Sequence, residues 1–117
     1  MSKPEFEFFR ATDIGWTPVP GKVAGLEERI LARDPDSGVA TRILRFRPGT
    51  DTAPNGVLTH DFWEEIYILE GAIYDISLGK NFTAGMYACR PPGMRHGPFL
   101  SRAGCLMLET RYGAPRQ

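Results

Sequence analysis

The only two histidines of this 117-residue chain, His60 and His96, are its most informative residues for chemistry. Each lies in a turn-rich stretch beside an expected strand boundary, and Glu64 follows His60 by four residues. Imidazole and carboxylate groups are the usual protein ligands of zinc, iron, manganese, nickel and copper. Histidines also serve as packing or surface residues, and a pair such as Glu64-Glu65 also marks a solvated strand end. On residue types alone, a metal site and a structural role are both open.

The composition is that of one globular domain. The apolar fraction is 42% and the charged fraction 24%, both ordinary values, and a chain of this length buries about two-thirds of its unfolded surface. Lys plus Arg and Asp plus Glu both number 14. This balance gives no electrostatic reason to expect nucleic acid or an anionic membrane. We therefore expect a small-molecule substrate or ligand as partner, with no nucleic acid and no membrane.

The start of the chain shows no export signal. Its first ten residues, MSKPEFEFFR, mix charges with aromatic rings and contain no continuous apolar run. No stretch approaches the roughly 20 apolar residues of a membrane span. We expect a cytoplasmic protein in which Cys89 and Cys105 are reduced, small and buried.

Short β-prone segments separated by glycine and proline predict an all-β fold. The turn-forming residues 34–38 (DPDSG) indicate a hairpin between the first two strands. Segments 65–69 and 72–78 form either a tight hairpin or one bent strand. About eight to ten such strands, with almost no helix, predict a sandwich or barrel. The clearest segments are 26–33, 39–46, 57–60, 65–69, 72–78, 86–90 and 105–111.

The second half of the chain resembles a motif of the cupin superfamily. That motif is written G-x5-P-x-G-x2-H-x3-N. The residues that match it are Gly85, Pro91, Gly93 and His96, and Leu100 stands where the motif has asparagine.

A second resemblance to cupins precedes it in the chain. The first cupin motif, G-x5-H-x-H-x3-4-E-x6-G, is matched in its second half by His60, Glu64 and Gly71. Leu58 takes the place of its first histidine. Its leading glycine is displaced, because Gly49 lies too early, which implies an insertion within 51–56. The two motifs occur in the expected order and use both histidines of the chain.

The resemblance is greatest to the cupin domain of ChrR-type anti-sigma factors and their free-standing relatives, notably over residues 90–98 and in the hairpin before Arg45-Phe46. It implies an all-β, single-domain cupin barrel (a double-stranded β-helix or jelly roll) over residues 1–117. Residues 1–15 would form an N-terminal arm or strand, and 112–117 a loose tail. Cupins pair or exchange N-terminal strands in homodimers, and the apolar start fits this arrangement through Phe6, Phe8, Phe9 and Trp16.

The same resemblance implies one divalent metal ion (Fe, Mn, Ni or Zn) held by His60, Glu64 and His96. Positions 58 and 60 share a face of a strand, and the Pro91-Pro92-Gly93 corner would present His96 from another segment. Two histidines and one carboxylate leave coordination positions open for water, substrate or dioxygen. Two alternatives stay open. In the first, the turn after His60 differs by one residue from the motif alignment, and Glu65 is the ligand in place of Glu64. In the second, Leu58 at the position of the first motif histidine marks a barrel that has lost its metal.

These features predict a metal-dependent enzyme acting on a small organic substrate. Cupin dioxygenases are the nearest chemistry, and an isomerase, lyase or hydrolase would use the same geometry. We expect Tyr67 and Tyr74 as catalytic phenol donors, and Arg90 as a clamp for a substrate anion or else a surface ion pair. Two other functions remain: a cupin metal or ligand sensor without catalysis, and a metal-free binding barrel.

Overall fold

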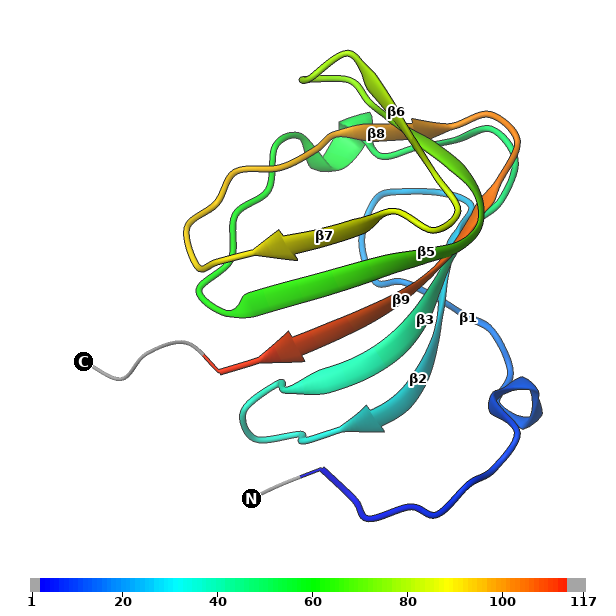
Figure 1. Cartoon of the computed structure of the whole chain (residues 1–117), viewed down its shortest axis with the longest axis vertical. Coiled ribbons are helices and arrows are strands. Elements are labelled where there is room, and N and C mark those ends of the chain that lie inside the picture. Colours follow the sequence, from blue (N-terminus) through cyan, green and yellow to red (C-terminus); the bar gives the residue numbers. More distant parts are fainter. Residues whose placement is uncertain (1–2, 114–117) are drawn as a thin grey trace.

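Nine strands and two single-turn 3₁₀ helices make up the computed structural model, which describes residues 3–113 (Figure 1). The predicted all-β class is confirmed. In chain order the elements are η1 (Ala11–Asp13), β1 (Thr17–Pro18), β2 (Leu26–Arg33), β3 (Ala40–Phe46), β4 (Thr50–Asp51), η2 (Ala53–Asn55), β5 (Trp63–Asp75), β6 (Lys80–Thr83), β7 (Tyr87–Arg90), β8 (Phe99–Ser101) and β9 (Cys105–Tyr112).

Strand β5 belongs to both sheets of the barrel. Its first half pairs with β9 and β7 in the larger sheet, which runs β1-β2-β3-β9-β5-β7, and its second half pairs with β6 and β8. A register shift between Ile68 and Glu70 marks the bend between the halves. All pairings are antiparallel, and the two sheets curl toward one another (Figure 1).

The longer predicted strands agree with the structure, and the short ones agree less well. The 26–33/39–46 hairpin is confirmed, with Leu26 opposite Phe46 and Arg33 opposite Ala40. Segments 65–69 and 72–75 belong to the single bent strand β5, which ends at Asp75, three residues before the predicted end. The strand predicted at 57–60 is wrong, because this segment makes only an isolated bridge. Strands β6 and β8 were missed, as were the two-residue strands β1 and β4. Tyr112 belongs to β9 and not to a loose tail, and residues 114–117 of the predicted tail lie outside the described residues.

The apolar core fills the concave side of the sheets. Alternation on each strand decides which side chains enter it, so Leu44 and Phe46 of β3 face inward with Cys105 and Met107 of β9. The prediction that both cysteines are buried is wrong for Cys89, which lies exposed on β7. Both thiols are free. Within residues 3–113, none of the helices is long and apolar enough to cross a membrane.

Candidate metal centre

The two histidines are brought together by backbone pairing between two loops. The amide of Leu58 donates to the carbonyl of His96 (2.8 Å), and the amide of His96 donates back to Leu58 (2.9 Å). The amide of Gly93 donates to the carbonyl of His60 (2.7 Å), so the Pro91-Pro92-Gly93 corner fixes both loops. The imidazole rings lie 4.9 Å apart, and that of His60 stacks on Phe62 at 4.6 Å. This pairing presents both rings to the same side of the barrel.

Glu64 supplies the third donor from the start of β5. It is 2% exposed and faces inward with Ile66 and Ile68, which lie in phase with it on the strand. The next residue, Glu65, faces the outer side, where its carboxylate accepts a hydrogen bond from the hydroxyl of Tyr87. Of the two alternatives left open by the sequence, the structure therefore places Glu64 at the histidines.

Donor atoms from His60, Glu64 and His96 all lie within 4.8 Å of one another. Nε2 of His60 lies 3.9 Å from Oε2 of Glu64, and Nε2 of His96 lies 3.8 Å from Oε1. Metal–ligand distances near 2.1 Å place neighbouring donors ~3 to 3.5 Å apart. The three side chains need only small movements to reach those distances, so the residues fit a divalent ion.

The tautomer of His96 also fits a metal. Its Nδ1 lies 3.2 Å from the carbonyl oxygen of Met94. A carbonyl only accepts, so Nδ1 carries the hydrogen and Nε2 turns a lone pair toward Glu64. A nitrogen lone pair and a carboxylate oxygen then face each other across 3.8 Å. A cation between them would satisfy both.

The electrostatic surroundings keep both imidazoles neutral. Burial, followed by the positive charge of Arg90, lowers the pKa of His96 to about 4. Burial and then Arg111 lower the pKa of His60 as well. Neutral imidazole is the form that binds metal, so near neutral pH little proton release is needed from these two ligands.

Two arginines flank Glu64 on the inner side of the sheet. Arg90 of β7 and Arg111 of β9 lie directly opposite Glu64 in the strand register. Nη1 of Arg90 donates to Oε1 of Glu64 (2.7 Å), and Nε of Arg111 lies 3.8 Å from Oε2. Burial, followed by the negative charge of Glu109, raises the pKa of Glu64, and the hydrogen bond from Arg90 opposes this rise.

A second carboxylate, Glu109, continues the row of buried charges along the sheet. Nε of Arg42 donates to its Oε1 (2.7 Å) and Nη2 to its Oε2 (3.2 Å), and Nε of Arg111 donates to Oε1 (2.8 Å). Burial alone would raise the pKa of Glu109, but the two arginines outweigh it and lower the pKa. Nη1 of Arg42 also donates to Glu28 (2.6 Å). We call these six side chains the charged wall: Glu28, Arg42, Glu64, Arg90, Glu109 and Arg111.

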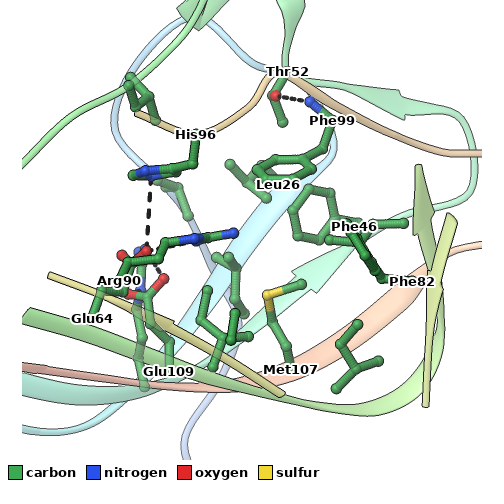
Figure 2. A pocket seen from close by; sticks show the side chains of 18 of the residues that line it. Leu26, Phe46, Thr52, Glu64, Phe82, Arg90, His96, Phe99, Met107 and Glu109 are labelled. Atoms are coloured by element: carbon green, nitrogen blue, oxygen red, sulfur yellow. Dashed lines mark hydrogen bonds and ion pairs between the residues drawn. The ribbon is translucent and has the colours of Figure 1, made fainter. Parts of the chain in front are cut away.

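A cavity of about 310 Å³ opens beside the histidines and the charged wall. Figure 2 shows Glu64, Arg90, Glu109 and His96 on one side of it. The other side is apolar and includes Leu26, Phe46, Phe82, Phe99 and Met107. The volume is at the lower end of the range for small-molecule sites, and a mostly apolar lining with a few convergent polar groups is typical of them.

The structure brings Arg90 to the cavity but not the two tyrosines. Tyr67 lies out of phase with Glu64 on β5, faces the outer side of the sheet and is 46% exposed. Tyr74 would be in phase, but the register shift after Ile68 reverses the alternation and turns Ile73 inward instead. Neither tyrosine belongs to the described residues that line the cavity, so their predicted catalytic role has no geometric support.

Sequence reasoning missed three of the charged residues at the site: Arg42, Glu109 and Arg111. Each lies in phase with inward apolar residues of its strand, Arg42 with Leu44 and the other two with Met107. This shared alternation with inward apolar residues was the sequence signal that could have placed the three charged residues inside the barrel. Leu58, in the place of the first motif histidine, lines the cavity and holds the loop of His96 through its backbone.

The curled antiparallel sheets have the fold of the cupin class, and the cluster of His60, Glu64 and His96 lies at the motif positions of that class. More specifically, residues 5–113 match the ChrR cupin-like domain family, and the chain belongs to that family. The resemblance inferred from the two motifs is confirmed. No curated protein matches the chain.

Solved structures agree on the fold. An RmlC-like cupin from Shewanella frigidimarina is 21% identical, with a TM-score of 0.74 over 99% of this chain and 97% of that one. An acetylacetone dioxygenase from Acinetobacter johnsonii is 18% identical, with a TM-score of 0.70 over 92% and 72%. The complex of Rhodobacter sphaeroides SigE with the anti-sigma ChrR contains a chain 23% identical, with a TM-score of 0.65 over 88% of this chain and 52% of that one.

Proposed function

We propose that this cupin holds one divalent metal ion through His60, Glu64 and His96 and acts on a small organic substrate in the adjoining cavity. The observation that carries the proposal is the convergence of three donor atoms within 4.8 Å at the cavity wall. The predicted cytoplasmic location belongs to the same proposal.

A metal ion bound there would supply a Lewis acid or a site for dioxygen. The chain's own residues would do the rest. His96 is oriented by Met94, and Arg90 is placed to bind an anionic oxygen beside the metal. The apolar side of the cavity excludes water from the substrate. Dioxygenase chemistry is the first candidate, because an acetylacetone dioxygenase shares the fold.

The test of the metal centre is the metal content of the untagged protein and of three variants. We expect one equivalent of Fe, Mn, Ni or Zn in the wild type, directly or after reconstitution. His60→Ala, Glu64→Gln and His96→Ala should each weaken binding by at least about a hundredfold, because the loss of even an outer-shell partner costs 10- to 100-fold. The measurement is elemental analysis with a competitive chelator titration.

Glu65→Gln is the matched control, because Glu65 adjoins Glu64 but faces the outer side of the sheet. It should bind metal as the wild type does. Failure of the wild type to bind any of the four metals stoichiometrically would contradict the proposal. Circular dichroism of each variant separates loss of metal from loss of fold.

A sensor or binding protein without catalysis is the second candidate. The ion pair between Arg90 and Glu64, at 2.7 Å, favours a binding protein that works without a metal, because Glu64 already has a partner of opposite charge. Oxygen uptake with a panel of diketones and catechols separates the two. Uptake that requires both metal and His96 supports the enzyme, and ligand binding without turnover, with or without metal, supports the sensor or binding protein.

The homodimer is also a proposal, supported by the exposed N-terminal arm. Phe6, Phe8 and Phe9 are exposed, and Phe8 entirely so. Trp16 is instead half-buried against its own sheet, where Cζ of Arg29 and of Arg45 lie 4.0 and 4.2 Å from its ring centre. Light scattering should give twice the chain mass for the wild type. The double variant Phe6→Asp/Phe8→Asp should be monomeric, and the control Leu78→Asp, another exposed apolar residue, should remain dimeric.

A further inference from the structure

The charged wall is electrically balanced before a metal enters. It contains three glutamates and three arginines, and every glutamate has an arginine within hydrogen-bond distance. Glu64 and Glu109 are the most deeply buried of them, each 2% exposed. Burying a charge without a partner is costly, and burying matched pairs is much less so.

A divalent ion at Glu64 would upset that balance. Its two neighbouring ligands are imidazoles, which bind metals in their neutral form and so contribute no negative charge. The wall would then carry an excess of two positive charges in a largely buried place. An anion bound beside the metal would relieve part of that excess. Binding of the metal and binding of an anionic ligand should therefore favour each other.

The hydrogen-bond pattern shows which arginines could hold such an anion. Arg42 has all three of its guanidinium nitrogens engaged, with Glu109 and Glu28. Among the hydrogen bonds of the described chain, Arg90 makes one, through Nη1, and Arg111 makes one, through Nε. A guanidinium carries five donors. Arg90 and Arg111 both line the cavity and keep donors available for a ligand.

The rest of the cavity sets the shape of that ligand. The side facing the charged wall is formed by large apolar groups, among them Phe46, Phe82 and Phe99 (Figure 2). Four of its members belong to the buried apolar core, so the surface is fixed by packing: Leu26, Phe46, Phe99 and Met107. A small hydrophilic anion would leave this side unfilled, whereas an apolar body would cover it.

From these observations we infer that the cavity binds a small amphiphilic carboxylate, whose head lies between the metal, Arg90 and Arg111 and whose apolar body lies against Phe46, Phe82 and Phe99. This inference rests on the proposed metal centre and adds a ligand class to it. It also assigns Arg111 as a second anion-binding residue. Metal and carboxylate should then assist each other, because coupling between two ligands is reciprocal.

The test uses calorimetry on the full chain loaded with Zn²⁺, which has no redox chemistry. The probes are hexanoate, its uncharged counterpart hexanamide, and acetate, which has the head without the body. We expect hexanoate to bind at least about tenfold more tightly than either. Zn²⁺ should in turn bind more tightly in the presence of hexanoate, by the factor that Zn²⁺ gives hexanoate.

Variants separate ligand binding from structure. Arg111→Gln should retain Zn²⁺ and lose the preference for hexanoate over hexanamide. Arg90→Gln should bind Zn²⁺ more tightly, because the competitor for Glu64 is removed, yet bind hexanoate more weakly; a purely structural arginine would not produce this opposite pair of changes. The control Arg47→Gln removes an exposed arginine that pairs with Glu27, and it should change neither affinity.

The two proposals fail in different ways. If Zn²⁺ binds and hexanoate binds no better than hexanamide, the ligand class is overturned and the metal centre stands. If Zn²⁺ does not bind, the titration is repeated with Fe²⁺, Mn²⁺ and Ni²⁺, and the metal centre is overturned if none of them binds. A preference for hexanoate that survives in both arginine variants would overturn the assignment of Arg90 and Arg111.

Discussion

Replacing Gly71 by alanine should cost about 4 kcal/mol or more of unfolding free energy. Gly71 lies in β5 opposite Cys105 and has a φ of +79°. A Cβ at this position would overlap the carbonyl oxygen of Gly104 and would lie 2.9 Å from its carbonyl carbon. These are backbone atoms of the residue that directly precedes β9, so the overlap can be relieved only by moving the start of β9 away from β5. Packing against Gly104 thus explains why the last position of the first motif, Gly71, is a glycine.

A matched control separates this overlap from the backbone conformation. Gly38, in the β2–β3 turn, has the same φ of +79°, and a Cβ there would meet nothing within 4 Å. Gly38→Ala should therefore cost only the left-handed conformation, about 1 kcal/mol. Urea unfolding with a chelator present gives both values without a contribution from bound metal. Equal losses in the two variants would show that the close approach of Gly104 has no effect.

The fold was predictable wherever alternation and turns agreed. The hairpin of β2 and β3 follows from the DPDSG turn between two β-prone segments, and the two strands pair along their whole length with one register shift, between Ile30 and Ala32. The strand prediction for 57–60 failed because Leu58 of this segment forms only an isolated bridge, with His96. The two residues are far apart in the sequence, so no local pattern indicates their contact. The β6 and β8 strands are short and exist by pairing with β5, which again is not local.

The site was predictable in its ligands and not in its surroundings. His60, Glu64 and His96 followed from two motifs, but Tyr74 was misplaced because the register shift in β5 reverses the alternation after Ile68. The wall residues of β9 were hidden by a different ambiguity. Both faces of that strand carry apolar residues, Met107 on the inner and Leu108 on the outer. Alternation alone therefore did not show which face of β9 turned inward, nor that Glu109 and Arg111 lie on that face.

Glu109 is the centre of the charged wall, and its neutralisation should be the most damaging isosteric change in the sheet. Its carboxylate accepts three hydrogen bonds, two from Arg42 and one from Arg111. Glu109→Gln preserves the shape and removes the charge, so two arginines lose a common buried partner. Breaking a buried ion pair in this way costs about 3 to 5 kcal/mol, because the remaining charge is left uncompensated.

Glu27→Gln provides the comparison, because Glu27 also accepts hydrogen bonds from two arginines, Arg45 and Arg47. That cluster lies on the outer side of the sheet, where Arg47 is largely exposed. Solvent screens such pairs, so the loss of charge should have little effect. Urea unfolding of the metal-free proteins should therefore show a large loss for Glu109→Gln and a small one for Glu27→Gln. If both variants lost equally little, the charged wall would contribute no more to stability than a surface ion pair, and its burial would serve ligand binding alone.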